Sequence, residues 1–268
     1  MKGKVIIITG ASSGIGKACA EAFGREGGNI VITGRNEEAL LAAADELRLK
    51  GIQVLPLVAD VSLEKDNERV VEETIEKFGK IDVLINNAGI SMRALFEELD
   101  LSVIRKVMDI NFYGTVYATK AALPHILKSK GSIVGMSSIA GYRGLPGRTG
   151  YSASKFAMHG FMESLRTELL KKDVHILLAC PGFTASNIRN AALSKDGHAQ
   201  GESPREEDKM MSAEEVAQHI LSAVRKRKRD VVLTTQGKMT VFLNKFFPAF
   251  MDKMVYNHMA KEKDSPLK

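Results

Sequence analysis

Cysteine is scarce in this sequence: only two occur among 268 residues, Cys19 and Cys180, and each stands among apolar neighbours. A disulfide scaffold is therefore excluded, and we expect two buried, reduced thiols in an intracellular, cytoplasmic protein. The sequence also has no uncharged apolar run near the roughly 20 residues of a membrane span. It begins Met1-Lys2-Gly3-Lys4 and enters an apolar strand at once, so we expect no secretory signal peptide.

Acidic residues are few near the C-terminal end, and this imbalance accounts for the net charge of +6. Residues 225–268 hold 11 basic and 4 acidic residues, a balance of +7, which leaves −1 for the first 224 residues. The basic run at 225–229 stands alone, without a zinc-ligand pattern or an aromatic RNA-binding motif. We therefore expect no nucleic-acid partner, and the sequence indicates no metal site.

Apolar, β-branched segments alternate with helix-period segments through most of the chain. This alternation predicts an α/β fold: a doubly wound, mostly parallel, seven-stranded Rossmann-type sheet in a single domain, with helices on both faces. Pro56 lies inside the third strand and predicts an edge position for it, as a strand order of 3-2-1-4-5-6 requires. The predicted strands are residues 5–9, 30–33, 54–59, 81–85, 132–136, 174–180 and 231–235.

Two segments depart from this alternation. Residues 187–211 are polar and rich in loop formers, and Ser212 with Glu215 predicts a capping box where the next helix begins. We expect residues 187–211 to form a mobile lid over cofactor and substrate. The second segment, residues 237–268, is an amphipathic extension that follows the main domain of residues 1–236.

A glycine-rich turn follows the first predicted strand and opens the first helix. Glycines there permit a tight turn and a close backbone approach, while the helix N-terminus offers free N–H groups to a pyrophosphate. A plain strand-to-helix turn is the alternative, but the strand–turn–helix context at the start of the chain favours a dinucleotide site. The residues expected to bind the dinucleotide are Gly10, Ser12, Ser13, Gly14, Ile15 and Gly16.

The residues after the second strand indicate which dinucleotide is preferred. An acidic side chain there binds the ribose 2′-hydroxyl and repels a 2′-phosphate, but this chain has Gly34-Arg35-Asn36. A guanidinium beside an empty position suits a 2′-phosphate through charge-assisted hydrogen bonds. We therefore expect Arg35 and Asn36 to bind NADP(H) in preference to NAD(H). The alternative is that Arg35 is only a solvated residue at a helix start.

Tyr151 and Lys155 are candidates for proton transfer. Their spacing of four places them on one face of a predicted helix. A phenol has a pKa near 10, and a neighbouring ammonium stabilises the phenolate, so we expect Lys155 to lower the pKa of Tyr151. Such a pair serves as proton donor and acceptor for a carbonyl and its alcohol. The pair alone is a weak signal, because this spacing occurs by chance on many helices.

Together with the glycine turn, these residues make the chain resemble the short-chain dehydrogenase/reductase family, over about residues 3–235. The resemblance implies that Ser138 hydrogen-bonds the substrate oxygen, that Tyr151 transfers the proton and that Lys155 holds the nicotinamide ribose. It also implies that Asn111 anchors a water in a proton relay. The matching motifs are TGASSGIG at 9–16, Asp60, Asn86-Asn87-Ala88-Gly89, Asn111, Ser138, YSASK at 151–155 and Pro181-Gly182.

The same resemblance assigns the remaining cofactor contacts. It implies that Asp60 and Val61 contact the adenine, while Asn87, Ala88 and Gly89 lie at the neighbouring ribose. The carboxamide contacts would come from Pro181, Gly182 and Thr184. Plainer interpretations stand beside these roles: Ser138 ends a strand, and Asn111 satisfies a kink in a helix.

The resemblance implies an NADP(H)-dependent enzyme acting on a small-molecule carbonyl or secondary alcohol, in a homodimer or homotetramer. One departure bears on the substrate: the T-G-Q…D-G-G ending typical of oxoacyl reductases is missing after the last strand. The sequence therefore favours a lipophilic steroid-, retinoid- or lipid-like ketone over a 3-oxoacyl thioester. A non-catalytic dinucleotide-sensing scaffold is the alternative from another class.

The extension is unusually apolar, with thirteen apolar side chains in residues 239–259. Pro248 suits the first turn of a helix, so we expect two short amphipathic helices. They either pack on the protein or a partner subunit, form a wall of the substrate pocket, or contact an anionic membrane peripherally through 237–259. Asp230 and Asp252 interrupt the flanking basic residues, which favours contact with protein over contact with lipid.

Overall fold

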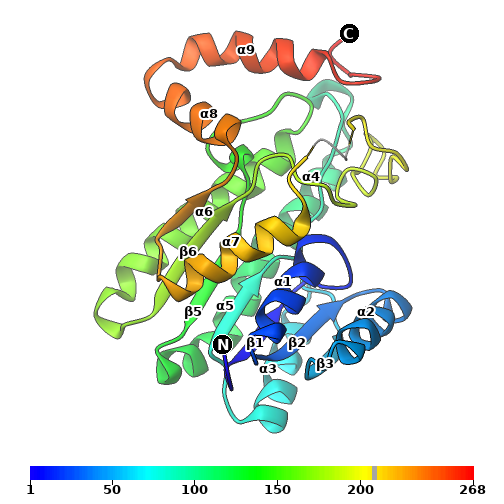
Figure 1. The fold of residues 1–268 in the computed structure, drawn as a ribbon. Helices are drawn as coiled ribbons and strands as arrows, with labels where there is room; N and C mark the ends of the chain where they lie inside the picture. The colour runs from blue at the N-terminus through cyan, green and yellow to red at the C-terminus, as the bar shows by residue number, and fades with distance from the viewer. Residues whose placement is uncertain (207–209) are drawn as a thin grey trace.

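A computed structural model of the chain, which describes residues 1–206 and 210–268, has one seven-stranded sheet at its centre (Figure 1). Every neighbouring pair of strands is parallel, in the order β3-β2-β1-β4-β5-β6-β7. The predicted fold and strand order are confirmed. The strands are β1 (Val5–Ile8), β2 (Asn29–Gly34), β3 (Val54–Val58), β4 (Val83–Asn86), β5 (Ser132–Met136), β6 (His175–Cys180) and β7 (Asp230–Val232).

The inner strands β1, β4, β5 and β6 are buried along their whole length. Their side chains are largely apolar on both faces, as a parallel sheet covered by helices requires. Pro56 lies on the edge strand β3 opposite Ile32, as predicted, since an edge tolerates a residue that has no N–H. Cys19 and Cys180 are free and buried.

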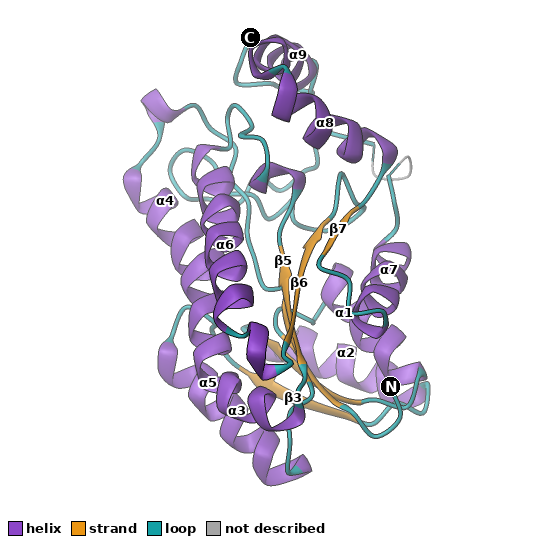
Figure 2. Cartoon of the chain, turned by 90° about the vertical axis from the view of Figure 1, so that its left-hand side faces the viewer, coloured by secondary structure: helices purple, strands orange, loops and turns teal. Residues whose placement is uncertain are grey.

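Helices cover both faces of the sheet (Figure 2). One core forms beneath α1 (Gly14–Arg25), α2 (Glu37–Leu49) and α7 (Ala213–Arg225). The other forms beneath α3 (Glu64–Phe78), α5 (Gly114–Ser129) and α6 (Thr149–Glu168). The remaining helices of the body are α4 (Leu101–Met108), the 3-10 turns η1 (Phe96–Glu98), η3 (Ile139–Gly141) and η4 (Leu170–Lys172), and the π-helix η2 (Asp109–Tyr113).

The last strand is shorter than predicted. β7 ends at Val232, whereas the apolar pattern predicted a strand to Thr235; that part of the prediction is wrong. Thr234 has a left-handed backbone, with φ 65°, and its hydroxyl accepts a 3.0 Å hydrogen bond from the N–H of Gly237. The chain therefore turns at Thr234, and α8 (Thr235–Phe246) begins two residues before the expected start of the extension.

The extension forms two helices above the carboxyl end of the sheet, α8 and α9 (Pro248–Ala260) (Figure 1). Pro248 lies in the first turn of α9, as predicted. The capping box of Ser212 and Glu215 at the start of α7 is also confirmed. No helix among the described residues has both the length and the apolar character needed to cross a bilayer.

The segment predicted as a lid crosses the same end of the molecule. Its residues 207–209 lie outside the described residues. Elsewhere it is held by isolated bridges that join Leu193 to Met92 and to Ala199. The N–H of Asp100 also donates a 2.9 Å hydrogen bond to the carbonyl oxygen of Lys195. The segment therefore lies against the loop after β4, and its motion stays a prediction.

Candidate active site

Two adjoining cavities lie at the carboxyl end of the sheet. One, of about 350 Å³, is lined by the glycine turn and the residues that follow β2, β3 and β4. The other, of about 470 Å³, lies between the ends of β5 and β6, helix α6 and the two helices of the extension. Ile15, Asn87 and Gly89 line both cavities, so the two cavities adjoin.

The glycine turn forms a backbone cradle that fits a dinucleotide. Gly10 has φ 63°, and a Cβ atom there would lie 2.7 Å from Cα of Ala88. A Cβ at Gly16 would lie 2.5 Å from Nδ2 of Asn87, which donates 2.9 Å hydrogen bonds to the carbonyl oxygens of Thr9 and Gly10. These contacts require glycine and hold the turn open at the helix N-terminus.

Most of the predicted cofactor residues line the first cavity. Gly16 does not, because it packs behind the turn against Asn87. Pro181, Gly182 and Thr184 line the second cavity beside Tyr151, where the nicotinamide end would lie. The predicted residues that line the first cavity are Gly10, Ser12, Ser13, Gly14, Ile15, Arg35, Asn36, Asp60, Val61, Asn87, Ala88 and Gly89.

The part of the first cavity that lies beyond the ends of β2 and β3 carries one basic and one acidic side chain. Nη1 of Arg35 lies 3.8 Å from Oδ2 of Asp60, and the Arg35 side chain is 55% exposed. Asp60 also accepts hydrogen bonds from the backbone and hydroxyl of Ser62, which fixes its carboxylate at the turn. Asn36 accepts a 2.8 Å hydrogen bond from the N–H of Ala39 and caps α2. Arg35 therefore lines the cavity beside Asp60, with about half of its side chain exposed.

Ser138, Tyr151 and Lys155 line the second cavity together. Ser138 follows β5 and caps η3, since its hydroxyl accepts a 3.2 Å hydrogen bond from the N–H of Ala140. Tyr151 lies in the first turn of α6, and Lys155 follows one turn later. Lys155 is buried and donates a 2.8 Å hydrogen bond to the carbonyl oxygen of Met136. The side chains come from two elements that meet at the cavity floor.

Burial dominates the electrostatics of Tyr151 and Lys155. Burial raises the pKa of Tyr151, and the hydrogen bond with Ser138 and the charges of Arg148 and Arg189 only partly oppose it. Burial also lowers the pKa of the Lys155 ammonium to about 8. The effect of Lys155 on the pKa of Tyr151 therefore stays a prediction. The phenol is held in its protonated, proton-donating form.

Asn111 is fully buried in the π-helix η2 and lines neither cavity. Its Oδ1 accepts a 2.8 Å hydrogen bond from the N–H of Ile90, and its Nδ2 donates 2.9 Å bonds to the carbonyl oxygen of Ile90 and to the hydroxyl of Ser154. A Cβ at Gly89 would lie 3.2 Å from Oδ1 of Asn111 and 3.6 Å from Nζ of Lys155. The structure therefore brings Asn111 and Lys155 together at Gly89, and the water relay stays a prediction.

The sequence reasoning missed a polar group behind Ser138. Ser137 shares a 2.7 Å hydrogen bond with Nε2 of His159, and Sγ of Cys180 lies 3.6 Å from the same nitrogen. Burial lowers the pKa of His159, so the neutral imidazole is favoured. No periodicity reveals this contact, because it joins β5, α6 and β6.

The second cavity is mostly apolar, and part of its wall belongs to the extension. Of the three interpretations offered for the extension, the pocket wall is the one that this lining supports. Arg148, Arg189 and Arg205 also line the cavity, which no sequence motif indicated. The residues of α8 and α9 that line the cavity are Gln236, Gly237, Met239, Thr240, Leu243, Met254, Val255, His258 and Met259.

Comparison with known proteins identifies relatives along most of the chain. A family model described as short chain dehydrogenase matches residues 4–197. Dehydrogenase/reductase SDR family member 7B of Mus musculus is 36% identical over 271 residues, covering 99% of this chain and 84% of the relative. The 11-beta-hydroxysteroid dehydrogenase-like 4A of Arabidopsis thaliana is 36% identical over 253 residues, covering 94% of this chain and 83% of the relative.

Solved structures share the fold. A short chain dehydrogenase/reductase from Burkholderia phymatum in complex with NAD superimposes with a TM-score of 0.82 at 27% identity, covering 93% of this chain and 95% of that one. An alcohol dehydrogenase from Thermococcus sibiricus complexed with 5-hydroxy-NADP gives a TM-score of 0.76 at 25% identity, covering 86% and 95%. The two neighbours thus carry different nicotinamide dinucleotides in the same fold.

Proposed function

Because this chain belongs to the short-chain dehydrogenase/reductase family of oxidoreductases, we propose that it transfers hydride between NADP(H) and the carbonyl or secondary alcohol of a lipophilic small molecule. One observation carries the proposal. Ser138, Tyr151 and Lys155 open into an apolar cavity of about 470 Å³ that adjoins the dinucleotide cradle.

Each side chain has a defined part in the proposed reduction. A bound nicotinamide supplies the hydride. The Ser138 hydroxyl donates a hydrogen bond to the substrate oxygen and orients it. The Tyr151 phenol, protonated because it is buried, gives its proton to the same oxygen as negative charge develops there. Lys155, anchored on Met136, holds the nicotinamide ribose and keeps positive charge beside the phenol.

NADP(H) is the proposed cofactor because Arg35 stands where an acidic residue would repel a 2′-phosphate. Gly34 leaves this position open: a Cβ there would lie 3.5 Å from the nearest atoms, in Leu40 and Ser12. The guanidinium is free to turn from Asp60, 3.8 Å away, toward a phosphate in the cavity. NAD(H) would gain no comparable contact at this end.

The proposed substrate is a steroid-, retinoid- or lipid-like ketone. The apolar cavity wall built by α8 and α9 supports it, and the name of the Arabidopsis relative refers to an 11-beta-hydroxysteroid. A 3-oxoacyl thioester is the competing substrate. A non-catalytic sensor is the competing function, and it would bind NADPH without oxidising it.

An NADPH-oxidation screen tests the proposal. Purified protein is offered ketosteroids, retinal, 3-oxoacyl thioesters and small ketones, with the Tyr151→Phe variant as the matched control. Oxidation with a lipophilic ketone, lost in the variant, supports the proposal. Oxidation only with thioesters assigns the competing substrate, and NADPH binding without any oxidation assigns the sensor.

We also propose two partners. By resemblance to its family the protein forms a homodimer or homotetramer. The outer face of the extension, defined as Phe242, Phe246, Phe247 and Phe250, contacts an anionic lipid surface. These four side chains are 56–61% exposed. Three exposed residues of the same two helices are basic: Lys238, Lys245 and Lys253.

The two acids that argued against lipid contact are both neutralised by the body. Asp252 forms an ion pair with Arg143, and Asp230 lies 3.0 Å from Nη2 of Arg166. Neither presents an isolated negative charge on the outer face. An exposed aromatic face with basic neighbours is complementary to the headgroup region of an anionic bilayer.

A further inference from the structure

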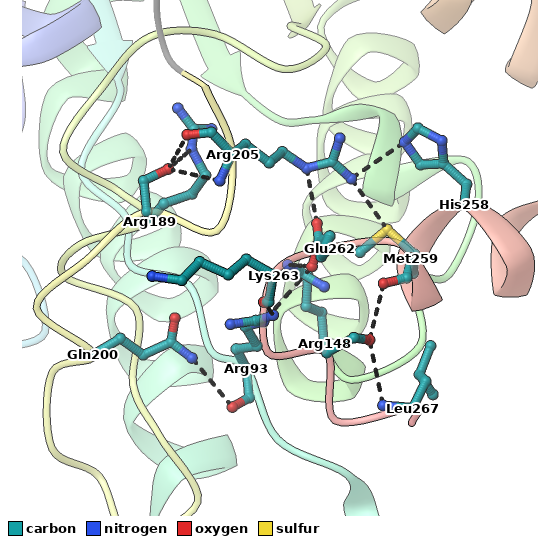
Figure 3. Close-up of polar contacts among 12 residues, drawn as sticks. Arg93, Arg148, Arg189, Gln200, Arg205, His258, Met259, Glu262, Lys263 and Leu267 are labelled. Atoms are coloured by element: carbon teal, nitrogen blue, oxygen red, sulfur yellow. Dashed lines mark hydrogen bonds and ion pairs between the residues drawn. The ribbon is translucent and has the colours of Figure 1, made fainter.

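One carboxylate near the C-terminus is surrounded by three arginines (Figure 3). The Glu262 side chain is 2% exposed and lies just beyond α9. Its Oε2 lies 2.7 Å from Nη2 of Arg148 and 3.6 Å from Nε of Arg93, while its Oε1 lies 2.8 Å from Nε of Arg205. Both oxygens of the carboxylate are therefore occupied.

The three arginines come from three different parts of the chain. Arg93 lies in the loop after β4, and Arg148 is the residue before α6, three positions before Tyr151. Arg205 lies in the segment that follows β6 and crosses the mouth of the site. Glu262 thus joins the C-terminal segment to the loop after β4, to the helix of the proposed proton donor and to residues 187–206.

Further contacts fix the same segment. Arg93 donates a hydrogen bond to the carbonyl oxygen of Lys263, and the Ser265 hydroxyl donates one of 2.9 Å to the carbonyl oxygen of Met259. On the other side, the Arg205 guanidinium lies 3.8 Å from the centre of the Phe183 ring. Arg205 also contacts Nε2 of His258 at 3.2 Å. Burial and the charge of Arg205 lower the pKa of His258, which favours the neutral ring that accepts this bond.

These contacts lie directly behind the substrate cavity. Arg148 and Arg205 line it, as do Val255, His258 and Met259 of α9. Met251, Val255 and Met259 are the buried face of α9, and Leu145, Leu243 and Leu267 pack against them. The cavity wall formed by α9 is therefore held by a small apolar cluster and by the ion pairs of Glu262.

A single substitution at Glu262 would remove the ion pairs that help to attach α9 to the rest of the protein. The charges of Arg148 and Arg205 lower the pKa of Glu262 more than burial raises it, so the carboxylate stays ionised. Nε of Arg93 is buried without a hydrogen bond, and the nearby carboxylate offsets its charge. Loss of one partner from such a buried cluster leaves the others uncompensated, which is strongly unfavourable.

We propose that Glu262 is a positioning residue for the substrate cavity: by binding Arg93, Arg148 and Arg205 it holds α9 and residues 187–206 closed over the substrate. The proposal deepens the proposed function, and it rests on that function for the identity of the cavity. It does not depend on which lipophilic ketone is reduced. It assigns to the C-terminal segment a part in substrate binding and none in dinucleotide binding.

The test compares Glu262→Gln with Glu202→Gln. Gln has the shape of Glu without its charge, and Glu202 forms a 3.0 Å ion pair with Lys263, the neighbour of Glu262, on the exposed surface. Hydrogen exchange is measured on α9, NADPH affinity by fluorescence titration, and KM and kcat with the ketone found in the NADPH-oxidation screen. Glu262→Asp, which keeps the charge on a shorter stem, tests rescue.

In Glu262→Gln we expect exchange in α9 and the KM for the ketone each to rise about 10-fold or more, because a buried ion cluster loses the carboxylate that pairs with all three arginines. The Kd for NADPH should change less than about 2-fold, and kcat less than KM, since neither depends on the α9 wall. Glu202→Gln should match the wild type, and Glu262→Asp should recover part of the loss.

Unchanged exchange in α9 of Glu262→Gln overturns the proposal. So does faster exchange with an unchanged KM, because α9 would then be loosened without affecting substrate. If Glu262→Gln fails to fold, Arg205→Met replaces it. In that variant Glu262 keeps its contacts with Arg93 and Arg148, so we expect smaller increases in the exchange of α9 and in the KM. Hydrogen exchange needs no substrate, so it tests the attachment of α9 even if no ketone oxidises NADPH. A screen without any oxidation would contradict the proposed function and leave the attachment of α9 to the exchange measurement.

Discussion

The Lys155 ammonium lies 5.6 Å from the centre of the Tyr151 ring, and its 2.8 Å hydrogen bond goes to the carbonyl oxygen of Met136. The two side chains share one face of α6, as their spacing predicted. The hydrogen bond nevertheless ties Lys155 to the end of β5, the strand that leads into Ser138. The proton donor and the side chain that orients the substrate are thereby positioned through one buried lysine.

The first prediction concerns the proton donor. Tyr151→Phe should lower kcat by roughly 10²–10⁴, the usual contribution of general acid catalysis, and leave the Kd for NADPH nearly unchanged. Initial-rate assays of ketone reduction measure kcat, and fluorescence titration measures the Kd for NADPH. Tyr113→Phe is the control, because Tyr113 is 44% exposed and lines neither cavity. Near-normal turnover in Tyr151→Phe would contradict the assigned role.

The second prediction is a pH dependence. The pKa of Lys155 is lowered to about 8, so its ammonium is complete well below pH 8 and is lost as the pH rises through that value. The pKa of Tyr151 is raised, so the phenol keeps its proton over the same range. The rate of ketone reduction should therefore fall above about pH 8. Lys155→Arg keeps its charge to much higher pH and should move this fall upward, even if its overall rate is lower.

The third prediction concerns cofactor preference. The double variant Gly34→Asp with Arg35→Ile adds a carboxylate and removes a guanidinium where a 2′-phosphate would lie. A lost charge-assisted hydrogen bond of about 1.5–3 kcal/mol corresponds to a shift of about 10-fold or more in the ratio of NADPH to NADH affinity. Arg35 is 55% exposed, so solvent screening favours the lower end. Arg48→Ile, in the last turn of α2, is the control. Equal affinities of the wild type for NADPH and NADH would refute the argument.

The sheet was predictable because its order depends on local signals. β-branched runs, helix-period spacers and Pro56 at an edge specify a parallel sheet with few alternatives. The end of β7 could not be predicted, because Thr234 takes a backbone conformation with positive φ that its residue type does not favour. The capping of α8 by the Thr234 hydroxyl outweighs the strand preference of residues 233–235.

The candidate site also has a part that short sequence motifs reveal and a part that only the folded structure reveals. Tyr151, Lys155 and the glycine turn lie within short motifs, so their neighbourhood was visible in the sequence. Glu262 and Arg205 are not within a motif, because their contact joins segments 57 residues apart and depends on how α9 packs. The burial that raises the pKa of Tyr151 was hidden from the sequence for a related reason: spacing reveals a neighbouring charge, whereas burial is known only once the fold is built.

The fourth prediction concerns stability. Burial lowers the pKa of His159, His175 and His258 below 6.5, the ordinary value for histidine, so the folded state binds fewer protons there than the unfolded chain. The folded state is therefore not penalised by these three histidines above about pH 6.5. As the pH falls from there toward their folded-state pKa values, the unfolded chain binds more protons than the folded state, and stability is lost. The free energy of unfolding in urea should therefore decrease between pH 7 and pH 5.

A variant pair isolates one of these groups. His175 is buried, with Nδ1 3.0 Å from the Ser132 hydroxyl and Nε2 2.8 Å from the carbonyl oxygen of Lys228, and Arg166 and Arg227 lie near enough to oppose its protonation. His175→Asn should reduce the slope of stability against pH, although it lowers stability at pH 7. His219→Asn, at an exposed position of α7, should leave the slope unchanged. An unchanged slope in His175→Asn would contradict the assignment.

The fifth prediction concerns the outer face of the extension, Phe242, Phe246, Phe247 and Phe250. Full-length protein should bind vesicles that contain phosphatidylserine, and binding should weaken with salt because lysine charges are screened. Phe246→Ser with Phe250→Ser should reduce binding about 10-fold or more, since each aromatic side chain withdrawn from water contributes about 1.5–3 kcal/mol. Sedimentation with vesicles at two salt concentrations measures both effects.

The matched control for this pair is Leu49→Ser with Leu170→Ser, two side chains that are 88% and 76% exposed on other parts of the surface. This variant should bind vesicles like the wild type. NADPH affinity should be unchanged in both variants, because neither pair lines the dinucleotide cavity. If the phenylalanine variant instead dissociates a dimer and no form of the protein binds vesicles, the outer face is a contact between subunits. The lysines beside it would then lie at a protein interface, where no salt-dependent attraction to lipid is needed.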